Sequence, residues 1–255
     1  MSDFNRNPAV RGFGADRAAA IDVGLRAYMI RVYNYMAIGV ALTGVVAWAT
    51  FQAAGGDALQ FTARGIIGAT PFGQAVFGSP LMWVLVLAPL ALVFFISFRI
   101  QHLQVGTARA LFFIYAGMVG LSLATIFMVY THASVTRVFF ISAASFGALS
   151  LYGYTTQRSL SGMGSFLTMG LFGLMIAMVV QIFLQSPMMD FLISIVGVLI
   201  FAGLTAYDTQ NIKEMYDVND DGTVAGRKSV MGALTLYLDF INLFLMLLRL
   251  LGDRR

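Results

Sequence analysis

Two aspartates interrupt apolar runs near the C-terminal end of the chain. Asp208 lies in LTAYDTQNIK, shortly after the run FLISIVGVLIF, and Asp239 lies inside LYLDFINLFLMLLRL. A carboxylate at the centre of a membrane-spanning helix costs about 2.5–3.5 kcal/mol to insert, so such residues usually face the interior of a bundle and have partners there. These two aspartates are therefore the residues most able to carry chemistry.

Two carboxyl groups brought together in a medium of low dielectric constant cannot both ionise easily. Such a pair loses its protons in two macroscopic steps, and the upper step can fall near physiological pH. The protonated pair holds a hydrogen bond, whereas the deprotonated pair repels itself and offers hard oxygen ligands to a cation such as Ca²⁺. Asp208 and Asp239 are thus predicted to form a pH sensor, to lie on an ion pathway and to be metal ligands. The alternative for each is a hydrogen-bonded packing residue.

The predicted depths of the two aspartates allow them to meet. Asp208 lies five residues before Lys213, about 7 Å from that end of its helix, and Asp239 lies nine residues after Val230, about 13 Å into the last span. The two helices run antiparallel through a short loop, so both side chains approach from the same side of the membrane. Helix tilt, or a last helix that begins outside the membrane, would remove the difference in depth between the two aspartates.

Polar residues recur on one face of the last span. The residues at helical spacing are Thr235, Asp239, Asn242, Met246 and Arg249. The opposite face consists of Leu and Phe, so this polar stripe predicts a last helix that is surrounded by other helices. Thr235 and Asn242 are the predicted supporting residues.

Arg99 ends the second apolar span, in FFISFRIQHL. A basic group near the pair would hold one carboxylate ionised and keep a gate shut, and Arg99 is the best-placed candidate for such a latch. A snorkelling arginine at the membrane surface explains the same residue equally well.

The composition of the chain makes the bilayer its solvent. Of 255 residues, 59% are hydrophobic and 11% are charged, and the mean hydropathy is +0.81. A soluble domain carries about 25% charged residues. The net charge of +4 therefore reports membrane topology rather than nucleic-acid binding. No cysteine is present, which excludes disulfides and thiolate chemistry.

Seven segments are long and apolar enough to span a bilayer as helices. They are Tyr28–Phe51, Leu81–Phe98, Ala108–Tyr130, Val138–Tyr154, Phe166–Leu184, Phe191–Ile212 and Val230–Leu251. The prediction is an all-α integral membrane protein with a transmembrane domain over residues 25–252. Residues 1–24 are predicted to be a mobile cytoplasmic tail. Pro89 lies inside the second span, where neighbouring helices can shield the carbonyl that it frees.

The basic residues predict the orientation. Eleven of the sixteen Lys and Arg residues fall on the N-terminal side and five on the other, so the N-terminus is expected in the cytoplasm. Seven full spans would leave the C-terminus outside, although RLLGDRR is basic; a last helix that crosses only partly would remove this conflict. The long loop from Gln52 to Ser79 is expected to hold a short interfacial helix around DALQFTARGIIG.

Enzymatic sites are not expected. DVNDDG resembles the opening of an EF-hand, but Lys228 stands where a bidentate Glu is required, so a solvated acidic loop is the better interpretation. Paired aspartates also suit an intramembrane aspartyl protease, yet the glycine-containing motif of that class is absent before Asp239. No P-loop, dinucleotide fingerprint or HExxH helix occurs.

The segment AYDTQNIK, followed after a short polar loop by MGALTLYLDFINLFLMLLRLLG, resembles the signature of the Bax inhibitor-1-like family, of a bacterial type. The resemblance covers about residues 25–252. It implies seven helices with the last one central between two three-helix layers, in the cell (inner) membrane. It also implies a pH-sensitive calcium leak, with Asp208 and Asp239 as the sensing pair and Arg99 as an approximate match to the latch.

A second function is consistent with the same resemblance, since some bacterial members are linked to a membrane-bound protease as modulators. The protein would then be a non-channel membrane protein that binds the protease or another partner, and the aspartates would only pack polar helices. The expected partners are thus the lipid bilayer, calcium ions and, in the alternative, a membrane protease. No cofactor is expected other than bound Ca²⁺.

Overall fold

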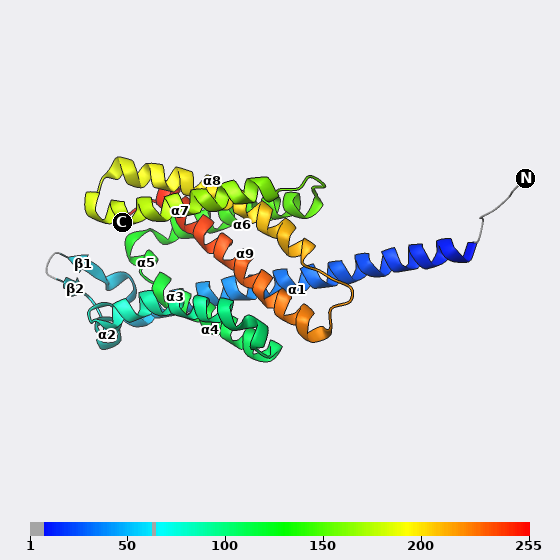
Figure 1. Cartoon of the computed structure of the whole chain (residues 1–255). Helices are drawn as coiled ribbons and strands as arrows, with labels where there is room; N and C mark the ends of the chain where they lie inside the picture. The colour runs from blue at the N-terminus through cyan, green and yellow to red at the C-terminus, as the bar shows by residue number, and fades with distance from the viewer. Residues whose placement is uncertain (1–7, 63–64) are drawn as a thin grey trace, which may run out of the picture.

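The computed structural model describes residues 8–62 and 65–255, and helices form nearly all of this part of the chain (Figure 1). The long helices are α1 (Pro8–Ala54), α3 (Leu81–Arg99), α4 (Val105–Leu123), α6 (His132–Thr155), α7 (Ser161–Leu184), α8 (Pro187–Glu214) and α9 (Gly222–Leu251). The shorter elements are η1 (Gly56–Ala58), β1 (Gln60–Thr62), β2 (Gly65–Ile67), α2 (Pro71–Phe77), η2 (Ile100–His102) and α5 (Ile126–Val129).

Seven helical segments of the described chain are long and apolar enough to cross a membrane, which confirms the predicted number. Most begin earlier than the hydropathy alone indicates. The largest shift is in the last span, which starts at Gly222 rather than Val230 because Asp221 caps it by accepting a hydrogen bond from the Val224 amide. Thr131 caps α6 in the same way. Polar first turns therefore extend these helices beyond the hydrocarbon layer.

The helices form two layers with α9 between them (Figure 1). One layer contains α1, α3 and α4, and the other contains α6, α7 and α8. In the most apolar stretch of α9, 72% of the residues are buried, compared with 11–39% in the other six spans. Helix α9 is therefore covered by neighbours on nearly all sides, and its polar residues face other helices rather than lipid. The central position that the resemblance implied for the last helix is thus confirmed.

Pro89 does not interrupt α3, which continues from Leu81 to Arg99. A proline removes the hydrogen bond to the carbonyl four residues earlier, here that of Leu85. The hydroxyl of Ser122 on α4 donates to this carbonyl at 2.6 Å. The neighbouring helix thus satisfies the acceptor that the proline frees, as the sequence led us to expect.

The loop between α1 and α3 differs from the prediction. In place of the expected interfacial helix, the described residues around 57–68 form the end of the 3₁₀ turn η1 and the antiparallel hairpin of β1 and β2, with Gln60 opposite Ile67. Gly68 has a φ of 73°, and a side chain at this position would also collide with the Ala58 carbonyl. The short helix of this loop is α2, which starts at Pro71 and is capped by Thr70.

The predicted N-terminal tail, residues 1–24, begins outside the described residues over its first seven positions. Helix α1 runs through the rest of the segment from Pro8, and the membrane-spanning part of the helix starts at Val23. The mobility of the tail stays a prediction.

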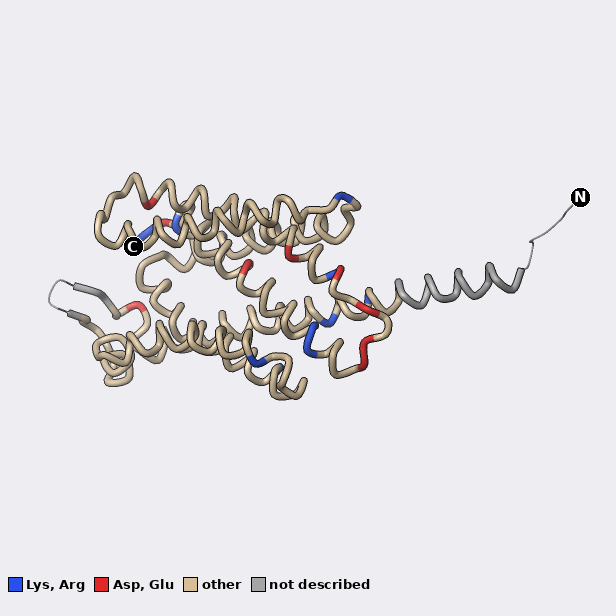
Figure 2. The backbone as a smooth tube through the Cα atoms, in the orientation of Figure 1, with Lys and Arg blue, Asp and Glu red and all other residues tan. Residues whose placement is uncertain are grey.

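The C-terminus lies at the opposite end of the bundle from the N-terminus (Figure 1). Helix α9 has 30 residues, about 45 Å of length, which suffices for a full crossing. The basic residues beyond it have acidic partners: Arg254 lies 3.5 Å from Asp190 and Arg255 lies 2.8 Å from Asp57. Figure 2 shows residues of both charges close to the C-terminus, and these ion pairs offset the positive charge of the basic segment.

The topology can be tested with single cysteines, because the natural chain has none. We expect Val218→Cys, in the α8–α9 loop, and Asp253→Cys, after α9, to react with a membrane-impermeant maleimide from opposite sides. In right-side-out vesicles only Asp253→Cys should react before permeabilisation, since the predicted orientation places the other loop in the cytoplasm. Reaction of both residues from one side would contradict a full crossing by α9.

Helices α6 and α8 approach closely at Gly153, where an added Cβ would collide with the carbonyl of Ala206. We expect Gly153→Ala to lower the free energy of unfolding in detergent by about 1–3 kcal/mol through overpacking. Gly147→Ala is the matched control on the same helix, because a Cβ there meets nothing within 4 Å. The control should be neutral or stabilising; equal losses of thermal stability in both variants would show that close packing at Gly153 is unimportant.

Candidate functional site

Asp208 on α8 and Asp239 on α9 meet between the two helices. Their carboxyl groups are neighbours that interact with each other. Asp239 is buried, with 5% of its surface exposed, and Asp208 is half-buried. Asp239 Oδ2 is buried and has no hydrogen-bond partner among the described residues. Since a carboxylate only accepts, a hydrogen bond between the two groups needs at least one proton.

The α8–α9 hairpin brings the two aspartates to the same depth. The loop between the helices is short, and Lys228 on the first turns of α9 donates to Asp220 at 2.6 Å. Between the loop and the pair, Gly232 allows a close approach: a Cβ there would lie 2.9 Å from Cγ2 of Ile212. The long first part of α9, which hydropathy assigned to the loop, supplies the turns that align Asp239 with Asp208.

The acidic loop has structural partners that leave no EF-hand arrangement. Asp217 accepts hydrogen bonds from the backbone and side-chain amides of Asn219, each at 2.9 Å. The backbone amide, more than the side chain, holds the pKa of the Asp217 carboxyl below its usual value. Asp221 caps α9, and Asp220 pairs with Lys228. These contacts agree with the interpretation of DVNDDG as an acidic loop.

A chain of hydroxyl groups lies beside Asp208. Tyr33 Oη on α1 is 2.6 Å from Ser150 Oγ on α6, which is 2.9 Å from Thr209 Oγ1 on α8. Thr209 gives its only proton to the Thr205 carbonyl at 2.7 Å, so the other two hydroxyls donate toward it. This chain joins α8 to α6 and α1. Sequence reasoning missed it, because only Thr209 is adjacent to a predicted site residue.

A separate hydroxyl pair holds α9 to the other layer. Tyr237 on α9 is fully buried, and its Oη lies 2.6 Å from Thr43 Oγ1 on α1. Thr43 also donates to the carbonyl of Ala116 on α4 at 2.8 Å. With its proton used there, Thr43 accepts from Tyr237. The tyrosine two residues before Asp239 thus connects α9 to α1 and α4.

The end of α8 beyond Asp208 is fixed to the second layer. The Gln210 side chain accepts from the Leu160 amide at 2.7 Å and donates to the Arg158 carbonyl at 2.9 Å. Lys213 donates to the Tyr154 carbonyl at 2.9 Å and lies over the Tyr154 ring. The C-terminal turns of α8, which follow Asp208 and contain Lys213, are therefore attached to α6 and to the α6–α7 connection.

Arg99 is not brought to the aspartates in this conformation. It is exposed at the end of α3 and, within the described part of the chain, forms no hydrogen bond or ion pair with Asp208 or Asp239. The basic residue that joins this corner to α9 is Arg227, which donates to the Gln101 carbonyl in η2. The latch role of Arg99 stays a prediction.

Thr235 and Asn242 lie on α9 on either side of Asp239 and are half-buried. Each donates to the carbonyl four residues earlier, Thr235 to Met231 at 3.2 Å and Asn242 to Leu238 at 2.9 Å. Neither side chain is hydrogen-bonded to the aspartates among the described residues. Their supporting role stays a prediction.

The pair contributes two carboxyl groups to any bound cation. No cluster of three or more His, Cys, Asp or Glu side chains with metal-binding geometry occurs in residues 8–62 and 65–255. Ca²⁺ takes 6–8 oxygen ligands, so water or backbone and hydroxyl oxygens would complete its shell. The metal-ligand role of Asp208 and Asp239 stays a prediction.

Comparisons with known proteins agree with this architecture. A family described as "Inhibitor of apoptosis-promoting Bax1" matches residues 25–255. The uncharacterized protein RP147 of Rickettsia prowazekii is 47% identical, over 92% of each chain. The inner membrane protein YbhL of Escherichia coli K12 is 45% identical, over 91% of this chain and 94% of YbhL. An uncharacterized protein of Caulobacter vibrioides is 42% identical over the full length of both. The chain is a multi-pass membrane protein that belongs to the Bax inhibitor-1-like family.

Proposed function

We propose that the protein is a pH-sensitive calcium leak channel of the membrane, gated by Asp208 and Asp239. The observation that carries the proposal is the meeting of two carboxyl groups from different helices inside the protein. Two such groups stay in contact only while they share a proton, because two carboxylates at this distance repel each other in a medium of low dielectric constant. The pair therefore converts proton concentration into a force between α8 and α9.

The hydrogen bonds around the pair support a movement between the layers. Asp239 belongs to a helix that Tyr237 attaches to α1 and α4 through Thr43. Asp208 belongs to a helix that Thr209 and Gln210 attach to α6 and the α6–α7 connection. Repulsion between the carboxylates would thus act between two helices that hydrogen bonds hold to different neighbours, with α1 common to both sets through Tyr33 and Thr43. In the proposed mechanism, the pair that shares a proton is the closed state.

The choice of Ca²⁺ rests on the chemistry of the pair and on the family resemblance, and the choice of membrane rests on a named relative. A deprotonated pair offers hard oxygens to a divalent cation, and Ca²⁺ is the ion that the family resemblance implies. Since the E. coli relative is named an inner membrane protein, we propose the inner membrane, with a cytoplasmic N-terminus, for this chain as well. We propose no catalytic activity, and an assay for cleavage of membrane-embedded substrates by Asp208→Asn and Asp239→Asn variants tests that proposal.

We expect purified protein in liposomes to carry a Ca²⁺ flux that rises from acidic to neutral pH. Loss of the shared proton opens the pair, and release of one proton changes the open population by up to about tenfold per pH unit. Asp208→Asn and Asp239→Asn remove the ionisable group on either side, so each should flatten the pH profile. A Ca²⁺-sensitive dye inside the vesicles measures the flux.

Glu214→Gln is the matched control for the flux measurement. Glu214 lies on the same helix as Asp208 but is exposed, so the same chemical change should leave the pH profile intact. An unchanged profile in both aspartate variants would remove the sensor role. Absence of any flux from the natural protein would favour the alternative, a modulator that binds a membrane protease or another partner.

The latch assignment can be tested in the same vesicles. If Arg99 holds the closed state, Arg99→Gln should increase the Ca²⁺ flux several-fold at acidic pH. The flux should then change less between acidic and neutral pH. Arg109→Gln is the control, because Arg109 is an exposed arginine at the same end of the bundle on α4. If the two substitutions have equal effects on the flux, Arg99 acts only as one of the basic residues at the membrane surface and not as a latch.

A further inference from the structure

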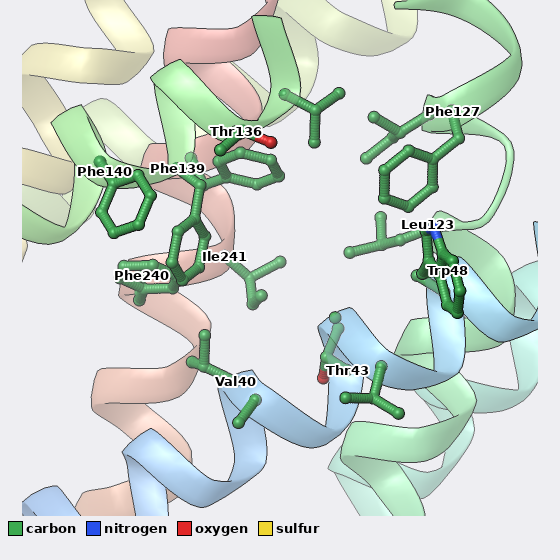
Figure 3. A pocket seen from close by; sticks show the side chains of 17 residues that line it. Val40, Thr43, Trp48, Leu123, Phe127, Thr136, Phe139, Phe140, Phe240 and Ile241 are labelled. Atoms are coloured by element: carbon green, nitrogen blue, oxygen red, sulfur yellow. The ribbon is translucent and has the colours of Figure 1, made fainter. Parts of the chain in front are cut away.

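A cavity of about 530 Å³, open on one side, lies between the two layers toward the C-terminal end of the bundle (Figure 3). Residues of α1, the α4–α5 segment, α6 and α9 line it. Ligand sites in proteins commonly have volumes of about 300–1,000 Å³. The walls labelled in Figure 3 are almost wholly apolar, including Val40, Leu123, Phe127, Phe140 and Phe240.

The cavity has an open side and a closed side. Val45 and Trp48 on α1 and Phe140 on α6 line it and are exposed, although all three lie within membrane spans. Phe240 and Phe244 on α9 also line the cavity and are buried. The mouth therefore faces the bilayer between α1 and α6, and the floor is the central helix.

Water is a poor occupant for this cavity. A buried water needs several polar partners, and apolar cavities stay dry. The Thr43 hydroxyl in the wall is already hydrogen-bonded to Tyr237 and to the Ala116 carbonyl. Since the medium at the mouth is hydrocarbon, the chemically matched occupant is a hydrocarbon chain.

A cation lies next to the mouth. Arg137 directly follows the lining residue Thr136 on α6, and 64% of its side chain is exposed. Its Nη1 is 3.8 Å from Asp253 Oδ2, an exposed contact of the kind that contributes little. The guanidinium therefore has donors available for a phosphate group. Arg137 lies five residues into α6, about 7 Å from the end of the helix, so its long side chain can reach toward the lipid headgroups.

We propose that this cavity is a phospholipid site. One acyl chain of a lipid in the leaflet at the C-terminal end of the bundle enters between α1 and α6 and contacts α9, and Arg137 binds the lipid phosphate. The site is separate from the aspartate pair, and lipid binding is measured independently of any ion flux.

The test uses the full chain in liposomes of phosphatidylethanolamine and phosphatidylglycerol, with a trace of phosphatidylglycerol that carries a diazirine near the end of one acyl chain. After illumination, peptide mass spectrometry locates the adducts. We expect adducts on the α9 peptide that contains Phe240 and Phe244. Bulk lipid cannot reach these buried residues, so only a chain inside the cavity labels them. Adducts confined to lipid-facing helices such as α7 would overturn the proposal.

Gly44 offers a substitution that fills the cavity without a clash. It lines the cavity, and a Cβ at this position meets nothing within 4 Å. We expect Gly44→Leu to reduce α9 labelling roughly tenfold, with Gly44→Ala intermediate, because added side-chain volume displaces the lipid chain. Gly173→Leu on α7 is the matched control, since it is equally open but outside the cavity, and should leave α9 labelling unchanged. If folded Gly44→Leu protein shows unaltered labelling of α9, the lipid chain does not reach α9 through the cavity, and the proposal is overturned.

A comparison of two lipid probes, one with and one without a phosphate group, tests the contact between Arg137 and the lipid phosphate. Arg137→Gln should reduce labelling by the phospholipid probe several-fold but not labelling by a diazirine-bearing diacylglycerol, which has no phosphate. Equal labelling of natural protein by both probes, with no effect of Arg137→Gln, would contradict the headgroup part of the proposal. Thermal unfolding in detergent confirms that each variant is folded.

Discussion

Hydrocarbon supplies no hydrogen bonds, so every polar group buried in a membrane protein must find its partner inside the protein. This constraint explains the described interactions of this bundle. Pro89 is tolerated because Ser122 donates to the freed Leu85 carbonyl, and Tyr237 is buried because Thr43 accepts from it. The same constraint brings Asp208 and Asp239 together, since a carboxyl group surrounded by apolar helices is most cheaply satisfied by another that shares a proton with it.

Hydrogen bonds attach the two helices that carry the aspartates to different neighbours. Helix α9 is bonded to α1 and α4 through Tyr237 and Thr43, while α8 is bonded to α6 through Thr209 and Ser150, and Tyr33 extends the latter chain to α1. The pair is therefore a contact between two helices that share only α1 among these hydrogen-bond partners. The proposed gate and the proposed lipid site both lie along the boundary between the two layers, where packing against α9 leaves room.

Charge follows the same logic at the membrane surfaces. Lys and Arg residues gather at the ends of the bundle, where water solvates them (Figure 2). At the C-terminal end, Asp190 and Asp57 lie near the arginines that follow or end α9. The basic C-terminal segment is thus held by Asp57 in the α1–α3 connection and by Asp190 in the first turn of α8, and its charge does not oppose a full crossing of the last helix.

Composition and hydropathy by themselves determined that the chain is a seven-span helical membrane protein and that Asp208 and Asp239 are its unusual residues, because the cost of burying charge in hydrocarbon is local and can be read along one helix. Helix ends such as Gly222 and the β1–β2 hairpin depended on capping and turn geometry, which hydropathy does not report. Only the tertiary structure decided that Tyr33, Ser150 and Thr209 form one chain, that Arg99 lies away from the pair and that a cavity opens between α1 and α6. These features join residues far apart in sequence, and the packing of whole helices, rather than the spacing within any one of them, brings such residues together.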